Sequence, residues 1–191
     1  MQRNSIFKPR GFRGVAAMAL FCAFTSSVSY AADSIEVAIE AVRAIGTEGK
    51  GFQEAIPAAR ELQQLPAEKL FVVLNGADGV NPIAENWIRG IAFGIAQRSG
   101  TPAISELKNY VVDQGNNAIG RGIAMELIKR EDASSAEKML DELLDDPSLA
   151  IREMAVEQAI GKAESLAKSQ ADSAVEIYRE TLAAARHPKQ L

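Results

Sequence analysis

Three similar segments recur along this chain at a nearly constant interval. Each contains an arginine, a large apolar residue two positions later and an alanine three positions later. The arginines are Arg89, Arg121 and Arg152, which are 32 and 31 residues apart. This interval accommodates one hairpin of two helices, and such hairpins stack because none can bury its apolar face alone. The repeat therefore predicts an all-α fold of stacked antiparallel helical hairpins.

Apolar residues elsewhere in the chain also recur at helical spacing. Residues 33–65 lie outside the register of the repeat, and we expect them to form N-terminal capping helices. Leu70–Leu74 is the one strand-like run, but the proline before it and the glycine after it favour a short buried helix. Residues 66–166 then contain the repeats, and residues 167–191 contain the last helix.

The expected helix starts are set by side chains that can cap the first N–H groups of a helix. The candidates are Asn81 before Pro82, Thr101 before Pro102, Asn116 or Asn117, Ser134 or Ser135, and the Asp146-Pro147 pair. Glycine inside a helix costs stability relative to alanine, so each such glycine needs a reason. Close packing between hairpins is the expected reason at Gly90, Gly94, Gly120, Gly122 and Gly161.

The segment Asp146–Ile160 resembles the second half of a HEAT repeat. It begins with an Asp-Pro turn, continues with an apolar residue followed by Arg152, and then has Ala155 and a further apolar residue one and two turns on. The copy around Arg121 keeps the arginine and the alanine, but has Gly120 in place of the apolar residue. The copy around Arg89 has its Asn-Pro turn further upstream.

This resemblance covers roughly residues 66–166 and implies a right-handed α-solenoid, a superhelix of the HEAT or armadillo type. It implies a fold and no particular function. In HEAT proteins the aspartate and arginine of successive repeats tend to pair along the stack, which here implies Asp113 and Asp145 or Asp146 with Arg121 and Arg152. The structural repeat positions are Arg89, Arg121, Arg152, Asp113, Asp146 and Pro147.

The last helix resembles one helix of a tetratricopeptide repeat. Ala174, Tyr178 and Leu182 are spaced by four, and together with residues 155–166 this helix would form a closing TPR-like hairpin. The whole pattern is similar to the helical N-terminal region of larger exported bacterial HEAT-repeat proteins, in which more sequence usually follows. It leaves open whether this chain is a truncated relative or a fragment.

The N-terminus has the three-part layout of a secretory signal peptide. Four basic residues without an acid precede the apolar run Val15–Phe24, and Ser29 and Ala31 are small residues at the −3 and −1 positions of a cleavage site. We therefore predict a signal peptide over residues 1–31 and an exported protein, periplasmic or secreted. An uncleaved anchor is disfavoured because the apolar run has ten residues, whereas a span takes roughly 20. A lipoprotein signal is disfavoured because a bulky Phe21 precedes Cys22.

Removal of this segment changes the charge and redox chemistry of the protein. Four bases and no acid leave with it, so the formal net charge falls from −4 to −8. An acidic domain repels phosphate backbones, and we expect no nucleic-acid partner. We also expect no stable membrane span after cleavage. Cys22 is the single cysteine, so the mature chain would have neither a disulfide nor a thiolate.

Three constellations could suggest chemistry. Gly115–Gly122 has the glycine spacing of a P-loop, but Arg121 and Gly122 stand where lysine and serine or threonine are needed. His187 is the only histidine and lies near a helix end, where capping is the favoured role. The acidic cluster Asp141–Asp146 fits a solvated face and an N-cap better than a calcium loop. We therefore expect no enzyme and no catalytic, cofactor-binding or metal-binding residue.

These expectations together favour an exported scaffold for protein–protein interaction, with an unknown protein as partner. Trp87, the single tryptophan, is either a core residue, which is favoured, or a contact with that partner. The alternative function is a helical accessory segment of a larger exported enzyme, for example a carbohydrate-active one that uses a pair of carboxylates.

Overall fold

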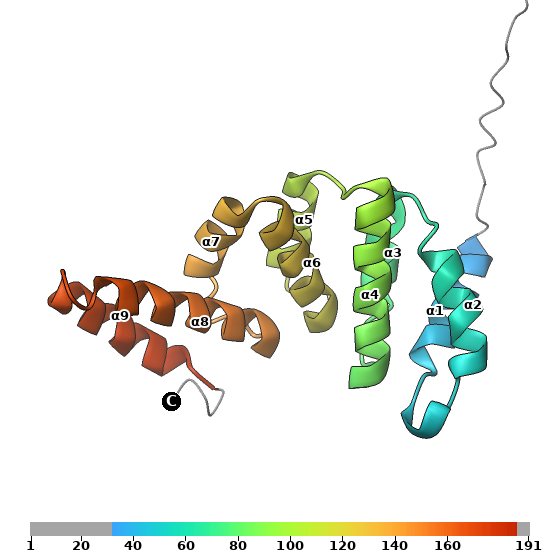
Figure 1. Cartoon of the computed structure of the whole chain (residues 1–191), viewed down its shortest axis with the longest axis horizontal. Helices are drawn as coiled ribbons and strands as arrows, with labels where there is room; N and C mark the ends of the chain where they lie inside the picture. Colours follow the sequence, from blue (N-terminus) through green and yellow to red (C-terminus); the bar gives the residue numbers. More distant parts are fainter. Residues whose placement is uncertain (1–31, 187–191) are drawn as a thin grey trace, which may run out of the picture.

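The computed structural model describes residues 32–186, which form nine α-helices, two short 3-10 helices and no strand (Figure 1). The predicted all-α fold is confirmed. The predicted signal peptide, residues 1–31, and His187 lie outside the described residues. The α-helices are α1 (Ala32–Arg43), α2 (Phe52–Leu62), α3 (Leu70–Asn75), α4 (Pro82–Ser99), α5 (Ile104–Val112), α6 (Ala118–Glu131), α7 (Ala133–Asp141), α8 (Leu149–Leu166) and α9 (Ala171–Ala184). The 3-10 helices are Thr47–Gly49 and Ala67–Lys69.

Short and long helices alternate through the middle of the chain. Helices α3, α5 and α7 have 6, 9 and 9 residues, and each precedes a longer helix: α4, α6 and α8 have 18, 14 and 18 residues. The three repeat arginines lie on the longer helices. The sequence predicted this order of a shorter helix, a capped turn and an arginine-bearing helix, and it also predicted that Leu70–Leu74 is helical.

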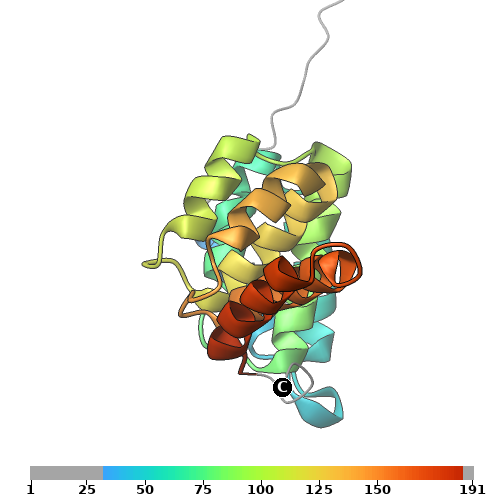
Figure 2. The same ribbon diagram turned by 90° about the vertical axis from the view of Figure 1, so that its left-hand side faces the viewer.

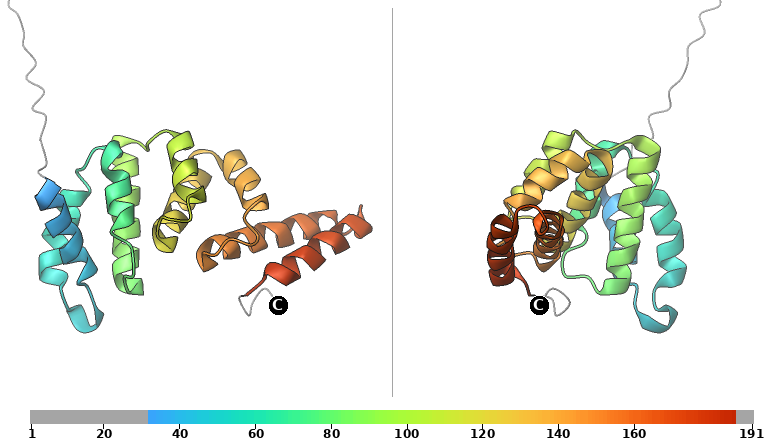
Figure 3. Two further views of the ribbon diagram at one scale, coloured as in Figure 1. Left: turned by 180° about the vertical axis from the view of Figure 1, so that it is seen from behind. Right: turned by 60° about the vertical axis from the view of Figure 1, so that its left-hand side comes forward.

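The helices form packed pairs, α1–α2, α3–α4, α5–α6, α7–α8 and α8–α9, and these pairs follow one another along the long axis of the molecule (Figure 1). Helix α4 contacts both α1 and α2, and α6 contacts α3, α4 and α8. The α8–α9 hairpin runs along the long axis, whereas α3, α4 and α6 stand across it. It crosses in front of the other helices when the molecule is seen end-on (Figure 2). The α1–α2 and α8–α9 hairpins therefore occupy opposite ends (Figure 3).

The buried apolar core is largest in the middle of this row. One continuous cluster extends from α1 to α8, and α6 is buried on most of its faces, from Gly120 to Met125 and again at Leu127 and Ile128. A helix that is buried nearly all round cannot show a clear apolar stripe. The core under α9 is a separate, small cluster around Val156, Ala184 and Ala185.

Polar side chains connect neighbouring hairpins by donating to carbonyl groups at helix ends. The Arg43 guanidinium of α1 donates to the Gly76 carbonyl after α3 at 2.6 Å. The Asn117 amide before α6 donates to the Leu74 carbonyl of α3 at 3.0 Å. Arg98 of α4 donates to two carbonyls after α2. Because the last carbonyls of a helix have no partner within the helix, these contacts satisfy them while fixing one hairpin to the next.

Asn81 and Asn117 cap α4 and α6 as predicted. The prediction that Thr101 caps α5 is wrong, because α5 begins at Ile104. The N–H of Ala103 there donates to Glu106 Oε2 at 3.2 Å. The Glu106 carboxylate, in the first turn of the helix, thus accepts the hydrogen bond at the start of α5 that a hydroxyl side chain before the helix was expected to accept.

Acidic and hydroxyl side chains begin the next two helices. Asp132, and neither Ser134 nor Ser135, caps α7, since its carboxylate accepts from the Ser135 N–H at 3.0 Å. Hydrogen bonds from the Ser135 side chain and backbone lower the pKa of Asp132. A carboxylate is favoured over a hydroxyl at a helix N-terminus because the helix dipole adds to the hydrogen bond. At α8 the cap is Ser148, two residues after the predicted start at Asp146.

Candidate functional site

The most buried polar feature among the described residues is an ion pair between α6 and the turn that precedes α8. Arg121 is 2% exposed and donates to both carboxylate oxygens of Asp146, through Nη1 at 3.1 Å and Nη2 at 2.6 Å. Its Nε donates to the Val111 carbonyl at the end of α5 at 2.6 Å. A planar guanidinium suits this two-point contact, which fixes direction as well as distance.

Asp146 organises the turn in which it lies. Its Oδ1 also accepts from the Ser148 N–H at 2.8 Å, and its carbonyl accepts from Arg152 Nε at 2.9 Å. Ser148 in turn donates to the Ala118 carbonyl at 3.4 Å. The turn before α8 is therefore attached to the end of α5 and the start of α6. The Arg121 guanidinium and the Asp146 carboxylate both have hydrogen-bond partners within the chain, so we assign this site a structural role.

The structure brings together some of the positions implied by the HEAT resemblance. The Arg121–Asp146 pair is present, and Arg152 binds the backbone of the same turn, including the Asp145 carbonyl at 3.4 Å. Asp113 lies elsewhere: it is exposed, and its Oδ1 accepts from the Gly115 N–H at 2.9 Å. Its role is to close the turn after α5.

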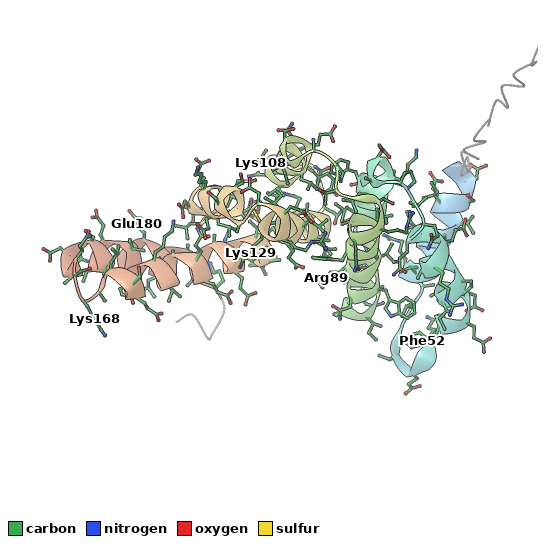
Figure 4. All side chains as sticks on the ribbon, turned by 45° about the horizontal axis from the view of Figure 1, so that its top comes forward. Phe52, Arg89, Lys108, Lys129, Lys168 and Glu180 are labelled. Atoms are coloured by element: carbon green, nitrogen blue, oxygen red, sulfur yellow. The ribbon has the colours of Figure 1, made fainter. Side chains whose placement is uncertain are left out.

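Arg89 differs from the other two repeat arginines because of its register on the helix. Arg121 and Arg152 lie four residues after their N-caps, Asn117 and Ser148, whereas Arg89 lies eight residues after Asn81. Arg89 is partly exposed, and its side chain extends from α4 toward α6 (Figure 4). There it pairs with Glu85 at 2.8 Å and with Glu126 at 3.2 Å.

Gly120 departs from the HEAT pattern because an added Cβ would lie 2.6 Å from the Leu74 carbonyl and 2.7 Å from the Tyr110 hydroxyl. Close packing is thus the reason for glycine at this position, as predicted. The same explanation is wrong for Gly90 and Gly161, where an added Cβ would meet nothing within 4 Å. Gly94 is intermediate, with the flexible Gln63 side chain at 3.0 Å.

The stretch with P-loop-like glycine spacing is a turn followed by the first residues of α6, and the segment before it is the end of α5 and not a strand. Its backbone N–H groups already have acceptors: that of Gly120 donates to Asn117 Oδ1 at 2.7 Å, and that of Arg121 to the Asn117 carbonyl at 3.0 Å. The residues of this loop therefore serve the packing of α6 against α3 and α5.

Tyr110 lies beside this loop on α5. Its hydroxyl donates to Asn75 Oδ1 at 2.7 Å, and its ring stacks on Phe71 with 5.1 Å between centroids. Burial, opposed in part by the Asn117 side chain and the Arg121 charge, raises the pKa of Tyr110 to about 12. The phenol is thus held in its neutral form as a structural donor.

A shallow recess of about 310 Å³ next to Tyr110 contains two acids, Glu106 and Asp113. Both accept backbone hydrogen bonds at helix ends, from Ala103 and Gly115 respectively. Two acids of the cluster Asp141–Asp146 are likewise engaged: Asp141 pairs with Lys162 and accepts from Gln158 at 2.7 Å, and Asp146 pairs with Arg121. Within residues 32–186 no group of three His, Cys, Asp or Glu residues is placed to hold a metal ion, and no helix is long and apolar enough to cross a membrane.

Trp87 is partly buried on α4 and packs against the main core. Its ring lies 5.7 Å from that of Phe52, at the start of α2, with an interplanar angle of 47°. Phe52 marks the lower end of the first hairpin in Figure 4. This contact attaches the first hairpin to α4, which fits the core role favoured from sequence.

An open apolar groove of about 690 Å³ lies between α1 and α2. Val37, Ala41 and Pro57 line it, and Val37 is 71% exposed. The lining residues of α1 lie on a face adjacent to the one, with Ile35 and Ile39, that is buried in the core. The sequence prediction missed this groove, because helical spacing does not specify which side of α1 and α2 a neighbouring helix covers. Val37 is the available signal, since it is an apolar residue off the core register of α1.

Acidic side chains surround the apolar floor of this groove. Asp33 of α1 and Glu54 and Glu61 of α2 are among its lining residues, and none of the described lining residues is basic. Carboxylates around an apolar surface attract a ligand that combines apolar and cationic groups. Of the surfaces described, this groove is the best candidate for a binding site.

No protein-family model matches the chain, and neither a curated protein nor a solved structure is significantly similar to it. The basis for a function is therefore the geometry of this chain itself.

Proposed function

We propose that the chain is an exported scaffold of stacked helical hairpins that binds another protein in the cell envelope through the α1–α2 groove. The observation that carries the proposal is the apolar groove, because concave sites with mostly apolar walls and a few polar groups at the edge are the usual form of a binding site. The rest of the stack holds this groove at one end of the molecule.

The scaffold itself is proposed to be a right-handed α-solenoid of the HEAT type. The alternation of short and long helices supports this, as does the buried Arg121–Asp146 pair, which matches the pairing along a HEAT stack. Repeats of this kind form extended surfaces whose position is set by their neighbours. Such an architecture suits binding better than chemistry.

The chemistry of the groove defines the partner. Two parallel walls and an apolar floor accommodate an amphipathic helix, the usual occupant of such grooves. Asp33, Glu54 and Glu61 favour lysine or arginine beside the apolar residues of that helix. The partner segment is therefore proposed to be a helix with one apolar face and adjoining basic residues.

Export is the part of the proposal that depends on the first 31 residues, and it has a direct test. The full chain would be expressed in a bacterial host, fractionated, and its intact mass measured. We expect a product in the envelope or the medium that begins at Ala32. A full-length product in the cytosol would refute export and would leave the groove proposal to be judged separately.

Binding at the groove is tested by site-specific photo-cross-linking in intact cells. A photoreactive amino acid would replace Val37 in one strain and Lys129, an exposed residue of α6, in a control strain. We expect a specific cross-linked product from position 37, identified by mass spectrometry and lost when Ala41→Glu places a charge in the groove. Equal products from both positions, or none from position 37, would refute the groove as a binding site.

A further inference from the structure

A polar furrow lies between α3 and α5, the short helices of two neighbouring hairpins. It consists of two adjoining recesses of about 310 Å³ and 300 Å³, which share Asn116. One wall is formed by α3 and the turn after it, the other by one face of α5, and the turn before α6 closes the end. The lining residues are Phe71, Asn75, Asp78, Glu106, Asn109, Tyr110, Asp113 and Gly115–Asn117. None of them lines the α1–α2 groove.

Contacts between the two helices fix the floor of this furrow. The Tyr110 ring stacks on Phe71 with 27° between the ring planes, and its hydroxyl donates to Asn75 Oδ1 at 2.7 Å. Asn116 Nδ2 donates to the Tyr110 carbonyl at 2.9 Å. The amide groups of Asn75 and Asn116 are therefore held in place before a ligand arrives, which lowers the entropic cost of binding one.

Asparagine is concentrated in the furrow. Residues 32–186 contain six asparagines, and four of them line it. Asn109 is exposed, and its side chain makes no hydrogen bond within residues 32–186. Since an amide side chain both donates and accepts hydrogen bonds, these residues match a ligand whose own groups do both.

The charge of the lining narrows the class of ligand. Asp78, Glu106 and Asp113 contribute carboxylates, and none of the described lining residues is basic. Carboxylates disfavour an anionic ligand and accept hydrogen bonds from hydroxyl or amino groups. An extended peptide offers donors and acceptors in equal number, whereas this furrow accepts more than it donates. A ligand rich in hydroxyl groups fits that excess better.

Phe71 adds an apolar surface beside these polar groups. Its side chain is half-buried and lines the same recess as Glu106 and Asn109. The face of an aromatic ring is electron-rich and attracts groups with positive edges. The C–H groups on one face of a sugar ring are of this kind, while the hydroxyl groups at the rim of the same ring remain free for the amides and carboxylates.

We propose that the furrow between α3 and α5 binds an oligosaccharide of uncharged or amine-bearing sugars. One sugar lies on Phe71 with its hydroxyl groups on Glu106 and Asn109, and the next lies beside Asp78 in the second recess. The two recesses have the size usual for small-ligand sites, roughly 300–1,000 Å³. The inference goes beyond the proposed function and does not depend on it: the scaffold would hold a glycan at this furrow and a protein at the α1–α2 groove.

Titration of sugars into the ¹⁵N-labelled full chain, followed by NMR, tests the inference. The probes are the linear tetramers of N-acetylglucosamine, of glucosamine and of glucose. We expect at least one of them to give saturable shifts, confined to amide signals of residues that line the furrow and of their neighbours in sequence. No saturable shift with any of the three sugars, or shifts centred on other helices, would overturn the inference.

Two variants at exposed side chains locate the binding. Asn109→Ala is expected to raise the Kd for the sugar about fivefold to tenfold, because it removes hydrogen bonds to the ligand. Asn86→Ala is the matched control, since Asn86 is an exposed asparagine of α4 outside the furrow, and we expect the Kd to stay unchanged. Asp78→Asn keeps the shape of the furrow and removes one charge, so it is expected to weaken the glucosamine tetramer more than the glucose tetramer. Circular dichroism checks that each variant is folded.

Equal Kd values for Asn109→Ala and Asn86→Ala would refute binding in the furrow. A short lysine–alanine peptide that shifts the same signals at lower concentration than every sugar would identify a peptide site and refute the glycan. The proposed function is judged separately by the cross-link from position 37, because no residue of the furrow lines the α1–α2 groove.

Discussion

Helices α6 and α9 have the same length, 14 residues each, but they are held in opposite ways. Helix α6 is surrounded by five neighbouring helices and contains a buried arginine that binds two other segments. Helix α9 packs mainly on α8, through alanines and one threonine, above a small separate core. Its larger apolar side chains face solvent.

This difference separates the part of the chain that is held by buried polar contacts from the parts that keep apolar side chains exposed. A buried ion pair and a close glycine contact lie at α6, and no buried polar side-chain atom among the described residues lacks a hydrogen-bond partner. The ends, α1–α2 at one side and α9 at the other, retain exposed apolar side chains. Local stability in proteins is uneven in this manner, and binding elements are drawn from the less stable parts.

The largest expected effect comes from comparing one buried and one exposed ion pair. Arg121→Met removes the partner of a buried carboxylate, and we expect it to lower the free energy of unfolding by about 3–5 kcal/mol. Lys162→Met removes the partner of Asp141 between α7 and α8, where both side chains are more than 40% exposed. We expect that loss to be about 0–1 kcal/mol. Urea unfolding followed by circular dichroism measures both.

Equal losses in the free energy of unfolding for these two substitutions would contradict the division between a centre held by buried polar contacts and loosely held ends. A small effect of Arg121→Met alone would show that Asp146 is stabilised sufficiently by the Ser148 N–H and the rest of its turn.

A pair of glycine substitutions tests packing at the centre with opposite signs. Gly120→Ala forces a methyl group against the Leu74 carbonyl, and we expect a destabilisation of about 1–3 kcal/mol. Gly90→Ala adds a methyl group in open space on α4. It is expected to stabilise the protein by up to about 1 kcal/mol, because alanine is the better helix former. The same urea titrations measure both, and a shift of the same sign in the two variants would refute the packing argument.

A pH titration tests the buried phenol of the centre. The pKa of Tyr110 is about 12 in the folded chain and 10.0 for a free tyrosine. Between these values the unfolded chain has lost the proton and the folded chain keeps it, so stability is present below pH 10 and falls as the pH rises toward 12. Relative to Tyr110→Phe, we expect the unaltered chain to lose about 3 kcal/mol across the whole titration, at about 1.4 kcal/mol per pKa unit. A constant difference between the two proteins would contradict the raised pKa.

Sequence periodicity predicted most of the fold because helices with regular punctuation are locally encoded. Asn81 and Asn117 begin helices in the structure as in the prediction, and Leu70–Leu74 is helical. The errors fall where a side chain competes for the same role: Glu106 satisfies the start of α5 in place of Thr101, and Asp132 caps α7 in place of a serine. Which of these side chains becomes the cap depends on where the helix begins to within about one turn, and the sequence does not specify that position.

The candidate sites were predicted less completely. The resemblance included Asp146 and Arg121 among several candidate partners, with Asp113, Asp145 and Arg152 as the others. It also included Arg89 as a repeat position, but Arg89 pairs with Glu85 and Glu126. The groove and the exposure of Tyr178 and Leu182 on α9 were not predicted, because they depend on which side of a helix its neighbour covers. Tyr178 and Leu182 are exposed because α9 packs on α8 through other residues, including Ala174 and Ala184. Helical spacing alone does not predict which residues of α9 make that contact.

Hydrogen–deuterium exchange of the full chain, measured by mass spectrometry, tests the central claim most directly. The account predicts that peptides from α6 exchange slowest, because α6 is buried among five neighbouring helices. Peptides from α9 are expected to exchange much faster, because α9 packs mainly on α8 above a small separate core. If α9 is as protected as α6, the division between a firmly packed centre and a loosely held end is contradicted.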